Sequence, residues 1–177
     1  MPMLPHDLPE TRADAAQRRR LKRELADAVR AGELALHYQP RICLRSLAQL
    51  GAEALARWPH RRRGLLSPGA FLPLAEEAGL TAEFGAWALE AACLAAAAWP
   101  ATLVVSVNVA AAQLAGAQLL HQVAAALERS ALPPERLDLE FGEAVLAEVD
   151  LDALLTLSAI RDLGVGLAGD KFGHGLA

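Results

Sequence analysis

The sequence predicts an α/β fold built around parallel strands, and three observations lead to that prediction. From residue 100 onward the pattern alternates strand, helix, strand, helix, strand, and two consecutive βα units imply parallel strands. Apolar residues make up 54% of the 177 residues, enough for the core of one domain of ordinary size. Polar residues stand near the carboxyl ends of the later strands, namely Asn108, Glu140 and Asp170. In a parallel barrel those ends form the active face, although these patterns alone do not separate a barrel from an open sheet.

The residue patterns in the first third of the chain predict a tail, a helix and two strands. Residues 1–13 hold three prolines and scattered charge, which predicts a flexible tail. Apolar residues then recur every three or four positions, so a helix is expected over 14–31, ending at Gly32. Alternating apolar residues predict a strand over 34–38, and a second strand is expected over 50–56. The composition of 59–64 favours a loop.

Helices and strands alternate through the rest of the chain. Ser67 followed by Pro68 is typical of a helix start, with the cap residue preceding a proline at the first helical position. The apolar run of 102–109 is typical of a strand that is covered on both faces. The elements expected from here on are helices over 68–78 and 82–98, strand 102–109, helix 111–130, strand 137–141, helix 151–163, and a strand that opens at 165.

Composition and charge exclude several classes of function. The net charge is −4, so no global positive field would hold a nucleic acid, and the Arg18–Arg23 cluster is interpreted as a solvated helix face. The apolar run of 86–100 is too short to span a bilayer, and the N-terminus does not resemble a signal peptide. Cys43 and Cys93 are both expected to be buried thiols in a reducing compartment. We therefore expect a cytoplasmic protein with neither a nucleic-acid nor a membrane partner.

Six ordered segments carry a resemblance to a known family. They are Tyr38-Gln39-Pro40, Glu53-Ala54-Leu55-Ala56-Arg57-Trp58, the stretch from Leu66 to Leu80, Ser106-Val107-Asn108-Val109, Leu139-Glu140-Phe141-Gly142-Glu143, and Gly169-Asp170-Lys171-Phe172-Gly173-His174-Gly175. Together they resemble the EAL domain family, whose members hydrolyse the bacterial second messenger cyclic di-GMP. The resemblance implies a TIM-barrel-like fold whose first strand runs antiparallel to the rest. It also implies that 14–177 is the N-terminal portion of such a domain, with roughly five of the eight strands of a barrel.

The resemblance assigns roles to eight residues. Four of them match ligands of the divalent metals, for which hard Mg²⁺ or Mn²⁺ prefers oxygen donors: Glu53, Asn108, Glu140 and Asp170. Three others match positions that hold the nucleotide, with the Arg57 side chain suited to phosphate: Gln39, Leu55 and Arg57. Glu143 matches a glutamate that steadies a loop. Taken singly, Asn108 also fits a polar core residue, Glu53 a surface strand residue, Arg57 a stacked surface residue and Glu143 a helix-start acid.

Two departures from the family pattern argue against catalysis. Lys171 stands where the family carries a second aspartate at its metal centre, and an ammonium there would repel a dication. The Lys171 ammonium group either takes the position of a metal ion and pairs with Glu53, Glu140 or Asp170, or it points to solvent. The sequence also ends at Ala177, so it includes no counterpart of the family's later lysine and glutamate.

These features predict a degenerate EAL domain of cyclic di-GMP signalling, not an enzyme and without a cofactor. It would act by weak cyclic di-GMP binding or by protein contact, through the open barrel edge (a homo-oligomer included) or through helix 14–31. The alternative is a cyclic di-GMP phosphodiesterase that uses Mg²⁺ or Mn²⁺ and obtains its missing strands from further sequence or a second chain.

Overall fold

The computed structural model describes residues 12–114, 118–142, 145 and 149–170, with the side chains of 12, 13 and 170 outside that description. Five strands form one sheet in the order β1-β2-β4-β5-β6, and β3 pairs with β2 beside this path. β1 is antiparallel to β2, while β2, β4, β5 and β6 pair in parallel. The strands are β1 (Ala35–Ile42), β2 (Gln49–His60), β3 (Gly64–Leu66), β4 (Val104–Val109), β5 (Leu137–Gly142) and β6 (Gly166–Asp170). The predicted α/β fold with an antiparallel first strand is confirmed.

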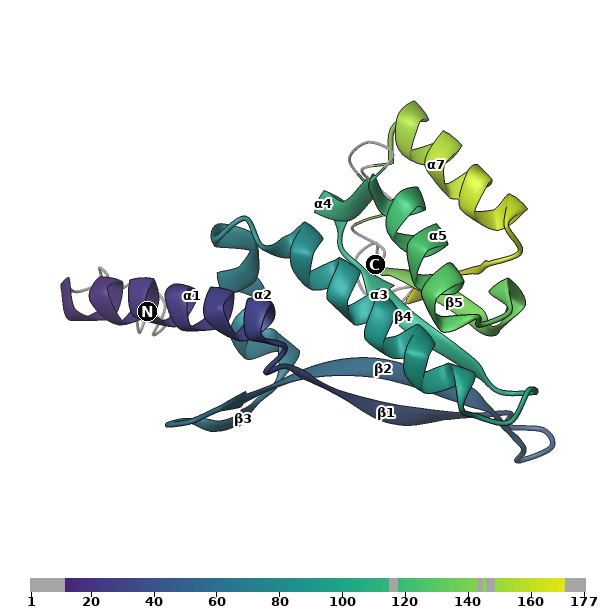
Figure 1. The fold of residues 1–177 in the computed structure, drawn as a ribbon, viewed down its shortest axis with the longest axis horizontal. Coiled ribbons are helices and arrows are strands. Elements are labelled where there is room, and N and C mark those ends of the chain that lie inside the picture. Colours follow the sequence, from purple (N-terminus) through teal and green to yellow (C-terminus); the bar gives the residue numbers. More distant parts are fainter. Residues whose placement is uncertain (1–11, 115–117, 143–144, 146–148, 171–177) are drawn as a thin grey trace, which may run out of the picture.

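The helices lie on one side of this sheet (Figure 1). They are α1 (Arg12–Ala31), α2 (Pro68–Glu77), α3 (Thr81–Ala97), α4 (Ala111–Leu114), α5 (Gln118–Ser130) and α7 (Leu151–Asp162), with a short 3-10 helix η1 at Pro134–Arg136. The helix predicted over 111–130 corresponds to α4 and α5, and the residues between them lie outside the described range.

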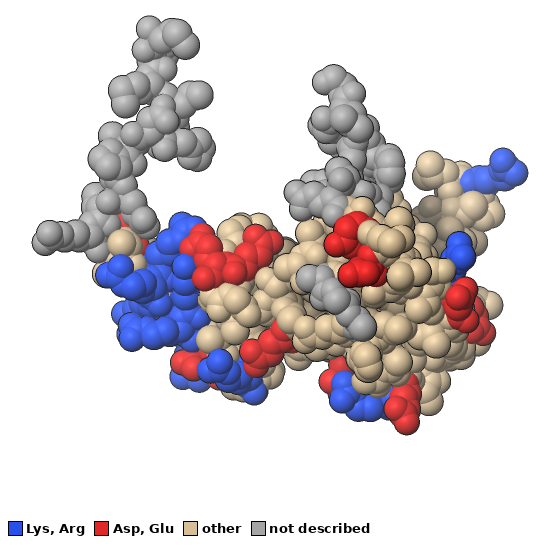
Figure 2. All heavy atoms as spheres, turned by 90° about the horizontal axis from the view of Figure 1, so that it is seen from above, with Lys and Arg blue, Asp and Glu red and all other residues tan. Residues whose placement is uncertain are grey.

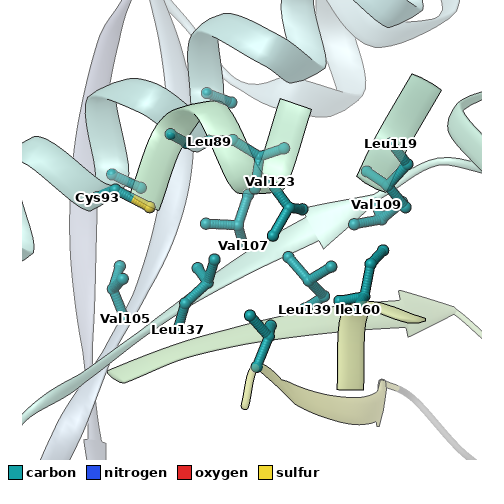
Figure 3. Close-up of a cluster of buried hydrophobic side chains, with 14 of the residues drawn as sticks. Leu89, Cys93, Val105, Val107, Val109, Leu119, Val123, Leu137, Leu139 and Ile160 are labelled. Carbon is teal, nitrogen blue, oxygen red and sulfur yellow. The ribbon is translucent and has the colours of Figure 1, made fainter. Parts of the chain in front are cut away.

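The main core lies between the sheet and the helices α3, α5 and α7 (Figure 3). Val105 and Val107 of β4, Leu139 of β5, and Leu89 and Cys93 of α3 are at most 2% exposed. Side chains alternate between the two faces of a strand, so a strand that buries its odd-numbered residues presents its even-numbered residues on the opposite face. Because of this alternation, the polar residues of β4 and β5 lie on the face of the sheet opposite the helices.

A second core holds α1 and α2 against the end of β2. Leu25 of α1 and Phe71 of α2 are fully buried, and Trp58 of β2 packs edge-on against Phe71 with ring centroids 6.2 Å apart. Outside this core, Glu77 forms ion pairs with Arg18 and with Lys22, the latter at 2.6 Å. Figure 2 shows a cluster of Lys and Arg side chains over α1, as expected of a solvated helix face.

Two expectations about local structure are wrong. Residues 59–64 are not a simple loop, because β2 continues to His60 and forms a hairpin with β3, in which Trp58 pairs with Leu66. Burial of Trp58 and His60 outweighs the loop-like composition of this stretch. Cys43 is only half-buried, because it lies in the turn after β1 and not in the core. Within the described residues, none of the helices has the length and apolar character that crossing a membrane would require.

Candidate functional site

The face of the sheet opposite the helices carries polar residues of β2, β4 and β5. Parallel pairing sets Glu53 beside Ser106, Ser106 beside Asp138, and Asn108 beside Glu140. The neighbouring residues Ala54, Val107 and Leu139 are buried on the helix side, so the polar set points the other way. We call this surface, made of Glu53, Ser106, Asn108, Asp138 and Glu140, the inner face.

Glu53, in the middle of β2, and Asn108, near the carboxyl end of β4, are in direct contact. The Asn108 Nδ2 atom donates a hydrogen bond of 2.6 Å to Glu53 Oε1. The Glu53 side chain is half-buried and Asn108 is exposed. The sequence predicted these two residues in one site, and the structure places them side by side across two strands.

Arg41 of β1 reaches across the inner face to β4 and β5. Its Nη1 atom lies 2.9 Å from Asp138 Oδ2 and 3.7 Å from Glu140 Oε1, and it also donates to the hydroxyl of Ser106. Ser106 is fully buried, and the Glu140 side chain is 12% exposed. A guanidinium cation therefore lies against two carboxylates of the inner face, one of which is a predicted metal ligand.

The residues predicted to hold a nucleotide lie on β1 and β2. Gln39 pairs in register with Glu53 and is exposed, while Leu55 and Arg57 follow Glu53 at alternate positions and are half-buried. They therefore share the face of Glu53. The Arg57 Nη1 atom donates to the Ala56 carbonyl at 2.8 Å.

A cavity of about 350 Å³ adjoins Glu53 and Asn108, between the middle of β2, the carboxyl end of β4 and the helices α2 and α3. Its lining includes Glu76 and Gln113, the latter 6% exposed. Gln113 Oε1 accepts from the Ala110 amide at 3.0 Å, but its Nε2 atom has no hydrogen-bond partner among the described residues. The apolar part of the wall is formed by Leu55, Leu72, Phe84 and Val107.

The residues of the inner face fit a divalent metal in their donor types but not in their charge arrangement. Glu53, Asn108 and Glu140 offer the oxygen donors that Mg²⁺ and Mn²⁺ prefer. However, the described residues contain no group of three or more acidic, histidine or cysteine side chains placed to hold an ion. The Arg41 cation beside Glu140 opposes a second cation there. We therefore derive no metal-dependent step for this chain.

The roles of all the predicted site residues remain predictions, and the side chains of three of them lie outside the described part of the structure. The β6 backbone brings Asp170 into register with Gly142, one strand beyond Glu140, but the Asp170 side chain is outside the description. Glu143 and Lys171 also lie outside the described residues, so neither the loop-steadying role nor the two placements of Lys171 are tested. The predicted protein partner or homo-oligomer at the open edge likewise stays a prediction. Near that edge, α7 and β6 expose several leucines, namely Leu151, Leu154, Leu155 and Leu167.

Sequence reasoning missed three residues of the site. The sequence patterns assigned no site role to Arg41, Asp138 or Gln113. The alternation of Leu137, Leu139 and Phe141 could have indicated Asp138, because it places that residue on the same face as Glu140.

Comparison with known proteins identifies the family. The family model described as "EAL domain" matches residues 22–177. An uncharacterized protein of Sinorhizobium fredii is 43% identical over 167 residues, which cover 94% of this chain and 20% of that protein. The bifunctional diguanylate cyclase/cyclic di-GMP phosphodiesterase MucR of Pseudomonas aeruginosa is 40% identical over 168 residues, covering 92% of this chain and 24% of MucR.

The solved structures agree with the sequence comparison. The PaMucR phosphodiesterase in its cyclic di-GMP complex superposes with a TM-score of 0.82 at 39% identity, over 89% of this chain and 66% of that chain. The chain thus spans about a fifth to a quarter of the curated relatives it matches. With the family model matching most of its length, the chain belongs to the EAL domain family.

Proposed function

We propose that this EAL domain binds cyclic di-GMP without hydrolysing it, and so acts as a receptor in cyclic di-GMP signalling. The observation that supports this most directly is the cavity beside Glu53 and Asn108, which adjoins the carboxyl end of β4. Ligands bind at the carboxyl ends of parallel strands in barrel folds. The related PaMucR phosphodiesterase was solved as a cyclic di-GMP complex.

The chemistry of the cavity suits a guanine base. Its apolar wall, with the ring of Phe84, can cover the faces of a purine. Glu76 also lines the cavity, and a carboxylate can accept hydrogen bonds from the N–H donors on the edge of guanine.

Arg57 is the residue we assign to the phosphodiester. It lies four positions after Glu53 on the same face, and a guanidinium forms strong paired hydrogen bonds with phosphate oxygens.

Two cations support binding without hydrolysis. Arg41 lies against Glu140 in the structure, and Lys171 replaces an acidic residue of the family motif in the sequence. Each lowers the negative charge available to a divalent metal. The alternative function, a metal-dependent cyclic di-GMP phosphodiesterase, is favoured by the contact of Glu53 with Asn108 and by the placement of Glu140 in register beside Asn108.

The test is calorimetric titration of the full chain with cyclic di-GMP, with and without Mg²⁺ or Mn²⁺, followed by chromatography of the mixture. We expect binding without linear dinucleotide, and loss of binding in Arg57→Ala. Arg63→Ala is the matched control, because Arg63 lies exposed in the turn between β2 and β3. Linear dinucleotide would establish the phosphodiesterase instead. Absence of binding in the wild-type chain would refute both nucleotide functions for this chain and leave protein contact as its role.

A further inference from the structure

The inner face is concave enough for β1 to reach β5 with one side chain. β1 and β5 are separated by β2 and β4 in the sheet, which corresponds to about 14 Å between their backbones if the sheet were flat. Arg41 on β1 nevertheless lies 2.9 Å from Asp138 on β5. In register with Arg41, β2 carries Gly51, so no β2 side chain stands between the guanidinium and the inner face.

We propose that Arg41 is a built-in counter-ion of the inner face, which pairs with Asp138 and Glu140 and weakens the binding of divalent cations there. Three groups fix the guanidinium: the buried Ser106 hydroxyl, Asp138 and Glu140. Arg41 is thus a positioning residue for Glu140. This inference deepens the proposed lack of hydrolysis and rests on the same Arg41–Glu140 pair, while nucleotide binding itself does not depend on it.

The distances set the size of the effect. A metal ion bound to Glu140 would lie about 2.1–2.5 Å from a carboxylate oxygen. The Arg41 Nη1 atom lies 3.7 Å from Glu140 Oε1, so a metal bound to that same oxygen would lie within roughly 6 Å of the arginine. Repulsion over that distance is large at an effective dielectric near 20, and the 37% exposure of the Arg41 side chain screens part of it. We expect removal of the cation to tighten divalent binding about ten- to a hundredfold.

The charge balance points the same way. Glu53, Asp138 and Glu140 bring three negative charges to the inner face, and Arg41 cancels one of them. Without the arginine, the negative charge of these carboxylates would attract a dication more strongly. The arginine also offers Glu140 a partner that needs no metal.

The experiment is a titration of the full chain with Mn²⁺, followed by the electron paramagnetic resonance signal of the free ion at constant ionic strength. Arg41→Ile removes the charge with a side chain suited to a strand. Arg41→Gln is a second neutral variant that retains hydrogen-bonding groups for Ser106 and Asp138. The matched control is Arg45→Gln, which removes the same charge from the exposed turn after β1.

We expect both Arg41 variants to bind Mn²⁺ at least about tenfold more tightly than wild type, with Arg45→Gln within about twofold of wild type. Adding Glu140→Gln to Arg41→Ile should return the affinity toward the wild-type value, which would place the ion at the inner face. If the folded Arg41→Gln protein binds Mn²⁺ like wild type, or if Arg45→Gln tightens binding equally, the proposal is wrong. Cyclic di-GMP titration of the same variants without metal reports on the proposed receptor function independently.

Discussion

Replacing Arg136 by methionine is expected to lower the free energy of unfolding by about 3 kcal/mol. Arg136 ends the short helix η1 before β5 and is 8% exposed. Its Nε atom donates to the Leu103 carbonyl at 2.9 Å, and its Nη2 atom donates to the Ala96 carbonyl at 2.8 Å. The second acceptor lies in the last turn of α3, where the helix dipole also favours a cation. This buried cation therefore joins the end of α3 to the starts of β4 and β5.

The magnitude follows from these two bonds. A hydrogen bond to a charged group contributes about 1.5–3 kcal/mol. We use the lower end for both, because the Ala96 carbonyl keeps the Trp99 amide as a partner at 3.0 Å and methionine preserves much of the apolar stem. The resulting loss of about 3 kcal/mol is a large part of the 5–15 kcal/mol that stabilises a typical domain.

Urea denaturation followed by circular dichroism measures this loss. Arg129→Met is the matched control, because Arg129 pairs with Glu90 at 2.9 Å while its side chain is 56% exposed. An exposed ion pair contributes less than about 1 kcal/mol, so the control should remain near wild type. A stability for Arg136→Met within about 1 kcal/mol of wild type would refute the assigned role of the two carbonyl bonds.

Three further predictions concern the turn after β1, the two thiols and the surface of α1. Leu47 is 76% exposed at a φ of 56°, a backbone region that suits glycine, so Leu47→Gly should raise the stability to urea by about 0.5–1 kcal/mol. Burial raises the pKa of the Cys93 thiol to about 12, while hydrogen bonds with Ser46 lower the pKa of Cys43. Mass spectrometry after iodoacetamide treatment at pH 8 should therefore find Cys43 modified well before Cys93, and equal rates would contradict this. The two cations of α1 hold the pKa of Glu77 at about 2, below its ordinary 4.5, so their pairing stabilises the protein above pH 4.5 and is lost as the pH falls toward 2. The melting temperatures of wild type and Glu77→Gln should accordingly differ at pH 7 and converge near pH 2.

The order of helices and strands could be predicted because each element keeps a clear periodicity. β4 and β5 carry alternating or continuous apolar residues, and these patterns depend only on the two faces of a single strand. The hairpin of β2 and β3 was missed because a proline and three arginines indicate a loop. What decides the structure there is the pairing of Trp58 with Leu66 across a turn that ends at Gly64, whose φ is +70°.

The candidate site could be predicted only where the family motif carried it. Glu53 and Asn108 are 55 residues apart, and no local pattern joins them, although the structure places them in contact. The pairs that Arg41 makes with Ser106 and Asp138 span 65 and 97 residues. Such contacts depend on strand order and sheet curvature, which the residue patterns alone do not determine.

Sheet curvature also bears on the choice that the sequence patterns left open, between an open sheet and a barrel. Two glycines allow neighbouring groups to approach where the sheet bends. A β-carbon at Gly51 would collide with the backbone of Val104, and one at Gly166 would collide with the carboxylate of Asp138. The same Asp138 carboxylate accepts a hydrogen bond from Arg41 of β1. The contact between β1 and β5 therefore passes over Gly51, which has no side chain to block it. In a flat sheet Arg41 would be too far from Asp138 to bind it, so the ion pair itself is evidence for a barrel-like curvature.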